Sequence, residues 1–163
     1  MKVGLYTLAK NDVEIFKGIV PDEVIENTGK TGYFVLGAVD EEYKVIGITQ
    51  FYINMLTDEE CDAQFVYLYV TDEYRNEGIA SQMIEKVHRI LRKSDISKSL
   101  VLLSKEENTE GNGLIVSEDK EEIFEKNGYI FMRVDPSSAQ FLSMLYTDID
   151  MDEMRQGVYW INR

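Results

Sequence analysis

Apolar and polar residues alternate along several stretches of this chain, a pattern that is typical of half-buried β-strands. Alternation, or a high density of β-branched and aromatic residues, predicts strands at residues 2–8, 33–39, 43–53, 63–70, 99–104, 129–134 and 157–162. The acidic turn Asp40-Glu41-Glu42 separates the second of these runs from the third. That short separation predicts a β-hairpin.

The apolar period changes from two to 3.6 after residue 79, which predicts a long helix over residues 79–91. Its apolar stripe consists of Ile79, Ala80, Met83, Ile84, Val87, Ile90 and Leu91. Most of the charged residues lie elsewhere on this helix, so we expect one buried face. Residues 139–145 have a similar period and predict another helix.

Shorter helices are predicted from capping residues. Asn11 is placed to cap a helix that Gly18 ends, and Pro21 is placed to open a second. Further along, Ser117 is placed to cap a helix that ends at Gly128.

The composition is that of an ordinary globular domain, with 44% hydrophobic and 29% charged residues in a chain of 163. No linker or repeat divides residues 1–163, so we expect a single domain. No apolar run reaches the roughly 20 residues that a membrane helix needs, and the single cysteine, Cys61, cannot form an internal disulfide. These features predict a cytoplasmic protein that does not bind membranes. We expect it to be a monomer or homodimer.

The chain is strongly acidic, with 30 Asp and Glu against 17 Lys and Arg and a net charge of −13. A protein with this charge repels polyanions, whereas nucleic-acid binding needs clustered basic residues. The charge therefore argues against nucleic acid as a partner and favours a cationic amine.

One turn of the chain is a candidate anion-binding site. The segment Arg75-Asn76-Glu77-Gly78-Ile79-Ala80 joins the predicted strand 63–70 to the helix 79–91. The first turn of a helix has backbone N–H groups without intrahelical acceptors, and these attract anions. Gly78 allows close approach to these amides, and Arg75 adds a positive charge.

This turn resembles the R/Q-x-x-G-x-G/A motif of the GNAT N-acetyltransferase family, which wraps the pyrophosphate of coenzyme A. The preceding Leu68-Tyr69-Val70 and Thr71-Asp72-Glu73-Tyr74 resemble the strand and loop of that family. The segment Phe124-Glu125-Lys126-Asn127-Gly128-Tyr129 is similar to its second landmark. The resemblance implies the α/β GNAT fold, a mixed and mostly antiparallel sheet of about seven strands flanked by four or five helices.

The resemblance also implies acetyl-coenzyme A as a co-substrate. The cofactor-binding residues that it implies are Leu68, Tyr69, Val70, Arg75, Asn76, Glu77, Gly78, Ile79, Ala80, Ser81 and Phe124. Backbone groups of Tyr69 and Val70 would pair with the pantetheine arm where two strands splay apart, and the amides of residues 75–81 would hold the pyrophosphate. A neutral amine would then attack the thioester directly, without a covalent enzyme intermediate.

Two positions depart from the pattern of the family. Many members have a glutamate base eleven residues before the motif, where this chain has Gln64. The family also commonly has a tyrosine acid four residues before the glycine of the second landmark, where this chain has Phe124. Neither side chain can transfer a proton in these roles.

Three alternatives for proton transfer stay open. Asp62 would share a face with Gln64 if the strand extends that far, and it would act as a base through water. Tyr67, Tyr69 or Tyr129 would act as an acid. Positioning of the two substrates alone would be the third route.

Other chemistry has little support in the sequence. The single histidine, His88, and the single Cys61 exclude metal sites built on several such residues, and we expect no metal and a rim position for His88. The segment 148–153 begins like a calcium loop, but Glu153 stands at the position that requires glycine.

The sequence therefore predicts an N-acetyltransferase that moves an acetyl group from acetyl-coenzyme A to a primary amine of a small molecule or a protein. The alternative is a non-catalytic GNAT-fold module that binds acyl-coenzyme A, which the residues Gln64 and Phe124 favour.

Overall fold

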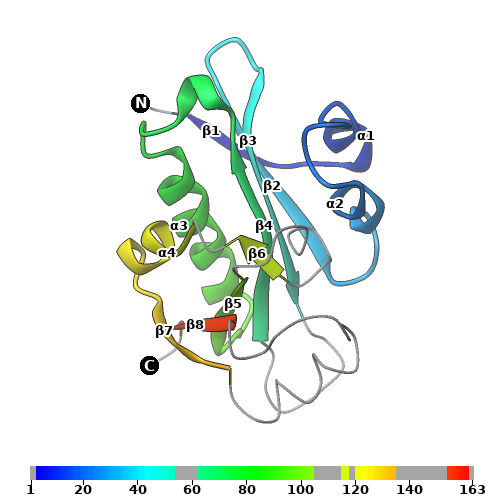
Figure 1. Ribbon diagram of the computed structural model, residues 1–163. Coiled ribbons are helices and arrows are strands. Elements are labelled where there is room, and N and C mark those ends of the chain that lie inside the picture. The colour runs from blue at the N-terminus through cyan, green and yellow to red at the C-terminus, as the bar shows by residue number, and fades with distance from the viewer. Residues whose placement is uncertain (1–2, 54–61, 105–114, 118–119, 135–153, 162–163) are drawn as a thin grey trace.

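The computed structural model (Figure 1) describes residues 3–53, 62–104, 115–117, 120–134 and 154–161. The strands are β1 (Gly4–Thr7), β2 (Tyr33–Val39), β3 (Val45–Ile53), β4 (Asp62–Val70), β5 (Lys98–Ser104), β6 (Ile115–Ser117), β7 (Ile130–Arg133) and β8 (Met154–Trp160). The helices are α1 (Lys10–Glu14), α2 (Asp22–Asn27), α3 (Ile79–Arg92) and α4 (Glu121–Lys126), with a 3-10 turn, η1 (Asp72–Tyr74). No helix of these ranges is long and apolar enough to cross a bilayer.

The strands form one mixed sheet in the order β1-β2-β3-β4-β5-β8-β7, with the short β6 paired to β5. The pairs β4–β5 and β5–β6 are parallel, and the other pairs are antiparallel. This confirms the predicted α/β fold with a mixed and mostly antiparallel sheet. The parallel pair β4–β5 lies in the middle of the sheet, where α3 connects its two strands.

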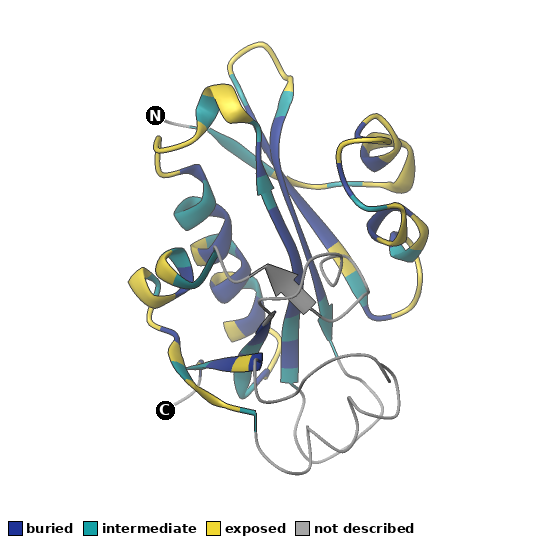
Figure 2. Cartoon of the chain, in the orientation of Figure 1, coloured by how far each residue is buried: buried dark blue, intermediate teal, exposed yellow. Residues whose placement is uncertain are grey.

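Helices cover both faces of the sheet, with α1 and α2 on one side and α3 and α4 on the other (Figure 1). The larger apolar cluster packs α3 and Phe124 of α4 against the sheet, and the smaller one packs α1 and α2 against the opposite face. Figure 2 shows the central strands buried and the outer surfaces of the helices exposed. The strands most deeply enclosed are those that the aromatic and β-branched runs predicted.

The long helix α3 confirms the predicted amphipathic pattern. Its buried residues are Ile79, Met83, Ile84, Val87, His88 and Leu91. The rim position expected for His88 is wrong, because its side chain is only 4% exposed. The reason is tertiary, since strands distant in the sequence cover this side of the helix.

Two predicted helix caps are also wrong. The first helix begins at Lys10, where the carboxylate of Asp12 accepts a hydrogen bond from the Ala9 amide at 3.0 Å, so Asn11 lies inside the helix. Ser117 belongs to β6, paired with Ser104 of β5, and α4 begins only at Glu121. Pairing with a distant strand overrides the local capping preference in this second case.

The last strand starts earlier than predicted, at Met154, because it pairs with β5 over the full length of that strand. The helix predicted at residues 139–145 falls outside the described residues.

Candidate functional site: a basic cleft at the start of α3

The two central strands diverge halfway along their length. Parallel pairing of β4 with β5 ends at Phe65 and Val101. At this level Val66 is an extra residue in the pairing of β4 with β3, which is a β-bulge that bends the strand. Beyond the fork β6 pairs with the edge of β5, whereas residues 66–70 of β4 have no paired strand on that side within the described ranges. This leaves backbone groups of β4 directed into the fork.

The turn after β4 presents the start of α3. Asn76 and Gly78 both have left-handed backbone conformations, with φ of 66° and 77°. Gly78 is the N-cap of α3, and it has no side chain to accept hydrogen bonds from the amides of the first turn. A Cβ added at Gly78 would meet no atom within 4 Å, so the glycine faces open space. The helix start is therefore an accessible and uncapped group of donors with the positive end of the helix dipole behind it.

A cleft of about 440 Å³ opens at this point. The described residues that line it are Leu68, Tyr69, Val70, Tyr74, Arg75, Asn76, Gly78, Ile79, Ala80, Ser81, Lys120, Ile123 and Lys126. Nine of them are residues that the sequence assigned to cofactor binding, and they come from the end of β4, the turn and the first turn of α3. The predicted residues Glu77 and Phe124 are not part of this lining.

The basic residue of the turn is held against β4. Arg75 donates a hydrogen bond from Nε to the Val70 carbonyl oxygen at 3.1 Å, and its Nη2 lies 3.2 Å from Oδ1 of Asp72. Its guanidinium also lies over the ring of Tyr69, 5.8 Å from the ring centre. With three contacts the side chain is oriented while still half exposed, so its charge is available to a ligand.

The second wall of the cleft was not predicted from the sequence. It is formed by Lys120, Ile123 and Lys126, which we call the α4 wall. They recur every three positions, from Lys120 at the N-cap of α4 to Lys126 at its end. This spacing was readable in the sequence but had no assigned partner. Asn127 fixes this wall, because its side-chain amide donates to Ser81 Oγ of α3 at 3.1 Å and to the Ile123 carbonyl at 2.8 Å.

Tyr74 was also missed as a cleft residue. Its hydroxyl donates to Oδ2 of Asp40 at 3.2 Å, and Oδ1 of Asp40 accepts the backbone amides of Glu42 and Lys44 at 2.9 Å each. The amide of Lys44 is the main cause that lowers the pKa of the Asp40 carboxyl. The β2–β3 turn thus holds Tyr74 in place next to the turn that begins at Arg75.

The second landmark, residues 124–129, packs against the core of the fold. Phe124 is fully buried and contacts the rings of Phe65 and Tyr129 edge-on, with centroids 5.2 and 5.0 Å apart. Gly128 has φ of 95°, and a Cβ there would lie 2.8 Å from the ring of Tyr159. The landmark therefore packs α4 onto the core, and its Asn127 bonds to Ser81 of the cleft lining.

The residues predicted to be catalytic are dispersed. Strand β4 does begin at Asp62, so Asp62 shares a face with Gln64 as expected, and its Oδ2 lies 3.8 Å from Lys98 Nζ. Asp62 is at the far end of β4 from Tyr69, roughly 23 Å away at 3.3 Å per residue. Tyr69 lines the cleft and stacks on Tyr67 with ring centres 6.4 Å apart.

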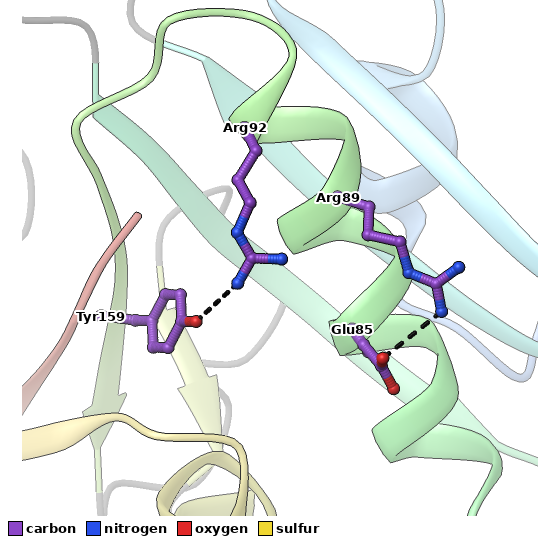
Figure 3. Close-up of polar contacts among 4 residues, drawn as sticks. All are labelled: Glu85, Arg89, Arg92 and Tyr159. Carbon is purple, nitrogen blue, oxygen red and sulfur yellow. Dashed lines mark hydrogen bonds and ion pairs between the residues drawn. The ribbon is translucent and has the colours of Figure 1, made fainter. Parts of the chain in front are cut away.

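Tyr129 lies instead in a buried polar network. Its hydroxyl is 2.8 Å from His88 Nε2 and 2.6 Å from Ser99 Oγ. The His88 ring stacks parallel to Tyr159 at 4.0 Å, and the hydroxyl of Tyr159 accepts a hydrogen bond from Arg92 at 2.8 Å (Figure 3). These contacts join α3 to the strands β5 and β8 of the sheet.

Burial decides the protonation of this network. Desolvation, followed by the nearby charge of Arg92, lowers the pKa of His88 to about 4. Desolvation also raises the pKa of Tyr129 above that of a free tyrosine. Tyr129 therefore retains its proton strongly, and its place outside the cleft lining gives no support to a role as the acid.

The comparisons with known proteins agree with this geometry. A sequence model of the acetyltransferase (GNAT) family matches residues 5–115, which is more than half of the chain. The chain belongs to the GNAT acetyltransferase family. None of the curated proteins is significantly similar to it in sequence.

Solved structures of GNAT proteins share its fold. NAA60 from Arabidopsis thaliana in complex with acetyl-CoA has a TM-score of 0.68 at 15% identity, over 99% of this chain and 100% of the other. The PaiA N-acetyltransferase from Thermoplasma acidophilum in complex with coenzyme A has a TM-score of 0.59 at 16% identity, over 98% and 100%. The GNAT protein YhbS from Escherichia coli in complex with CoA has a TM-score of 0.64 at 12% identity, over 99% and 83%.

Proposed function

We propose that this GNAT protein binds acetyl-coenzyme A in the basic cleft and transfers the acetyl group to a primary amine. One observation carries the proposal. Six of the seven residues 75–81 predicted for the pyrophosphate, all except Glu77, line a cleft that contains three basic side chains and, among its described lining residues, no acidic one. In a chain with 30 acidic residues, a cleft of this composition fits a polyanionic ligand.

The parts of the cleft match the parts of the proposed ligand. The uncapped amides of residues 78–81, together with Arg75, suit the pyrophosphate. The edge of β4 that faces the fork, where the backbones of Leu68 and Val70 point away from β3, suits the pantetheine arm, whose amides can add to a strand edge as another strand would. The thioester would then lie toward the fork at Phe65.

The acceptor is proposed to be a cationic amine, on the basis of the net charge of −13. Such an amine would be attracted by the field of the whole protein and would lose its proton before attack on the thioester carbonyl. A backbone amide of β4 would polarise that carbonyl. The attack forms the amide bond and breaks the carbon–sulfur bond, and the thiolate of coenzyme A leaves with the proton of the amine.

We propose that positioning of the two substrates supplies most of the rate, with a smaller contribution from proton transfer. Tyr69 is the proposed donor among the tyrosines, since it alone of Tyr67, Tyr69 and Tyr129 lines the cleft. Asp62 would have to act through water, because it is paired with Lys98 at the other end of the strand.

A second candidate is a non-catalytic module that binds acyl-coenzyme A. The observation that favours it is the placement of Phe124 at the usual acid position, where it is fully buried in the core and offers no proton. Gln64 at the usual base position points the same way. Both candidates require the ligand to bind, and only the enzyme releases thiol.

The test measures free thiol during incubation of the protein with acetyl-coenzyme A and a panel of amines, including polyamines, aminoglycosides and lysine peptides. We expect acetyl-coenzyme A to raise the melting temperature and at least one amine to accelerate thiol release above the rate of hydrolysis. Thermal stabilisation with no thiol release on any amine would favour the non-catalytic module. No stabilisation at all would contradict both candidates.

The charge of Arg75 gives a sharper prediction. Arg75→Glu should weaken acetyl-coenzyme A binding by roughly tenfold or more, because it replaces attraction of the phosphates with repulsion. The matched control is Arg89→Glu, which reverses the charge of another exposed arginine that pairs with a carboxylate, Glu85, on α3 but outside the cleft (Figure 3). Isothermal titration should show a loss of affinity for Arg75→Glu only. Equal affinities of the two variants would refute the placement of the pyrophosphate.

A further inference from the structure

The cleft has more positive charge than a pyrophosphate at a helix start requires. Arg75 and the amides of α3 form one wall, while Lys120 and Lys126 stand on the α4 wall. Arg75 is bound to the Val70 carbonyl and to Asp72, so its charge is fixed on the β4 side. The two lysines are therefore a separate group of cations on the other side of the same cleft.

The α4 wall is shaped for a ligand part that is both apolar and charged. Lys120 is the N-cap of α4 and Lys126 is its last residue, six positions further on, which is about 9 Å along the helix axis. Ile123 lies between them and is partly exposed. This arrangement presents an apolar contact flanked by two ammonium groups, which suits a nucleoside that carries a phosphate.

The wall is fixed in position, and the ion pair that Lys126 makes is weak. Asn127 ties the end of α4 to Ser81 in the first turn of α3. Lys126 pairs with Glu122 at 3.3 Å, but both side chains are largely exposed, and such a pair is weak. Lys126 can therefore exchange this partner for a phosphate at little cost.

We propose that the α4 wall recognises the 3′-phosphate of coenzyme A and makes the protein select coenzyme A thioesters over their dephospho forms. This rests on the proposed function, and it assigns Lys120 and Lys126 a role that neither the turn motif nor the second landmark indicated. The pyrophosphate occupies the α3 start, and the third phosphate of the same molecule lies between the two lysines.

The test compares the affinities of acetyl-coenzyme A and acetyl-dephospho-coenzyme A, measured by titration calorimetry. The wild-type protein should prefer acetyl-coenzyme A by about threefold to tenfold, the range of one or two exposed charge pairs. The double variant Lys120→Gln/Lys126→Gln should lose this preference while its affinity for the dephospho form stays the same. Single variants should each lose part of it.

The control is Lys17→Gln/Lys93→Gln, which removes the same charge from exposed lysines outside the cleft lining and should keep the preference. Equal wild-type affinities for the two thioesters would overturn the inference alone, as would an equal loss for both thioesters in the α4 double variant, which would assign the lysines to the pyrophosphate. A wild-type protein that binds neither thioester would overturn the proposed function as well.

Discussion

Gly78→Val should weaken acetyl-coenzyme A binding by at least about 100-fold, which corresponds to about 2.7 kcal/mol of binding free energy. Gly78 has φ of 77°, and the space next to its missing Cβ is open to the cleft. A valine side chain would project into that space, above the amides that are proposed to hold the pyrophosphate. It would also oppose the left-handed conformation that directs those amides outward.

The chain provides a matched control in Gly29→Val. Gly29 has φ of 92°, and a Cβ there likewise meets nothing within 4 Å, but it follows α2 and lies outside the cleft lining. Both substitutions carry a similar backbone strain, of order 1–3 kcal/mol. Urea unfolding should therefore show comparable destabilisation, and titration with acetyl-coenzyme A should show a loss for Gly78→Val only. If Gly78→Val binds as tightly as Gly29→Val, the start of α3 is not the phosphate site.

Acidification should reduce the stability of the wild-type protein through His88, by about 2–3 kcal/mol between pH 6.5 and 4. Burial lowers the pKa of His88 to about 4 in the folded state, against 6.5 for a free histidine. Near pH 8, well above 6.5, the imidazole is neutral in both states and adds no pH dependence. As the pH falls below 6.5, the unfolded chain binds a proton that the folded chain resists, so the unfolded state gains free energy from protonation and stability falls.

Replacement of His88 isolates this contribution, since it is the single histidine of the chain. His88→Gln keeps a polar side chain near Tyr129 but cannot titrate. It should lower the free energy of unfolding at pH 8 by a constant amount and flatten the loss between pH 6.5 and 4. Urea unfolding at a series of pH values measures both effects, and the carboxylates contribute equally to the two proteins. Parallel curves for wild type and variant would show that His88 does not titrate as described.

Local patterns were sufficient for much of the fold and for one wall of the site. The period of α3 identified its buried face, because a helix that packs on a sheet needs an apolar stripe whichever strands it meets. The segment from Arg75 to Ala80 predicted an anion site because strand, turn and helix start are adjacent in the sequence. Geometry of this kind depends on neighbouring residues alone.

The opposite wall required the tertiary structure. From the sequence alone, Lys120 and Lys126 are ordinary lysines with no assigned role. In the structure they line the cleft, because Asn127 joins α4 to Ser81. Tyr74 becomes a cleft residue only through its contact with Asp40 of a distant turn. The periodicity of apolar residues in the sequence does not predict which surface a short helix or a loop residue will face.

The positions of His88 and Ser117 likewise depended on distant parts of the chain. His88 was expected at a rim, and its burial results from Tyr129 and Tyr159, which reach it from the other end of the chain. Ser117 joined β6 because β5 offered backbone partners. The sequence by itself thus determined the elements and the turn that is proposed to bind an anion, because these depend on short-range periodicity and backbone conformation. The tertiary structure alone decided the second wall and the protonation of the core, because both depend on which distant side chains exclude water.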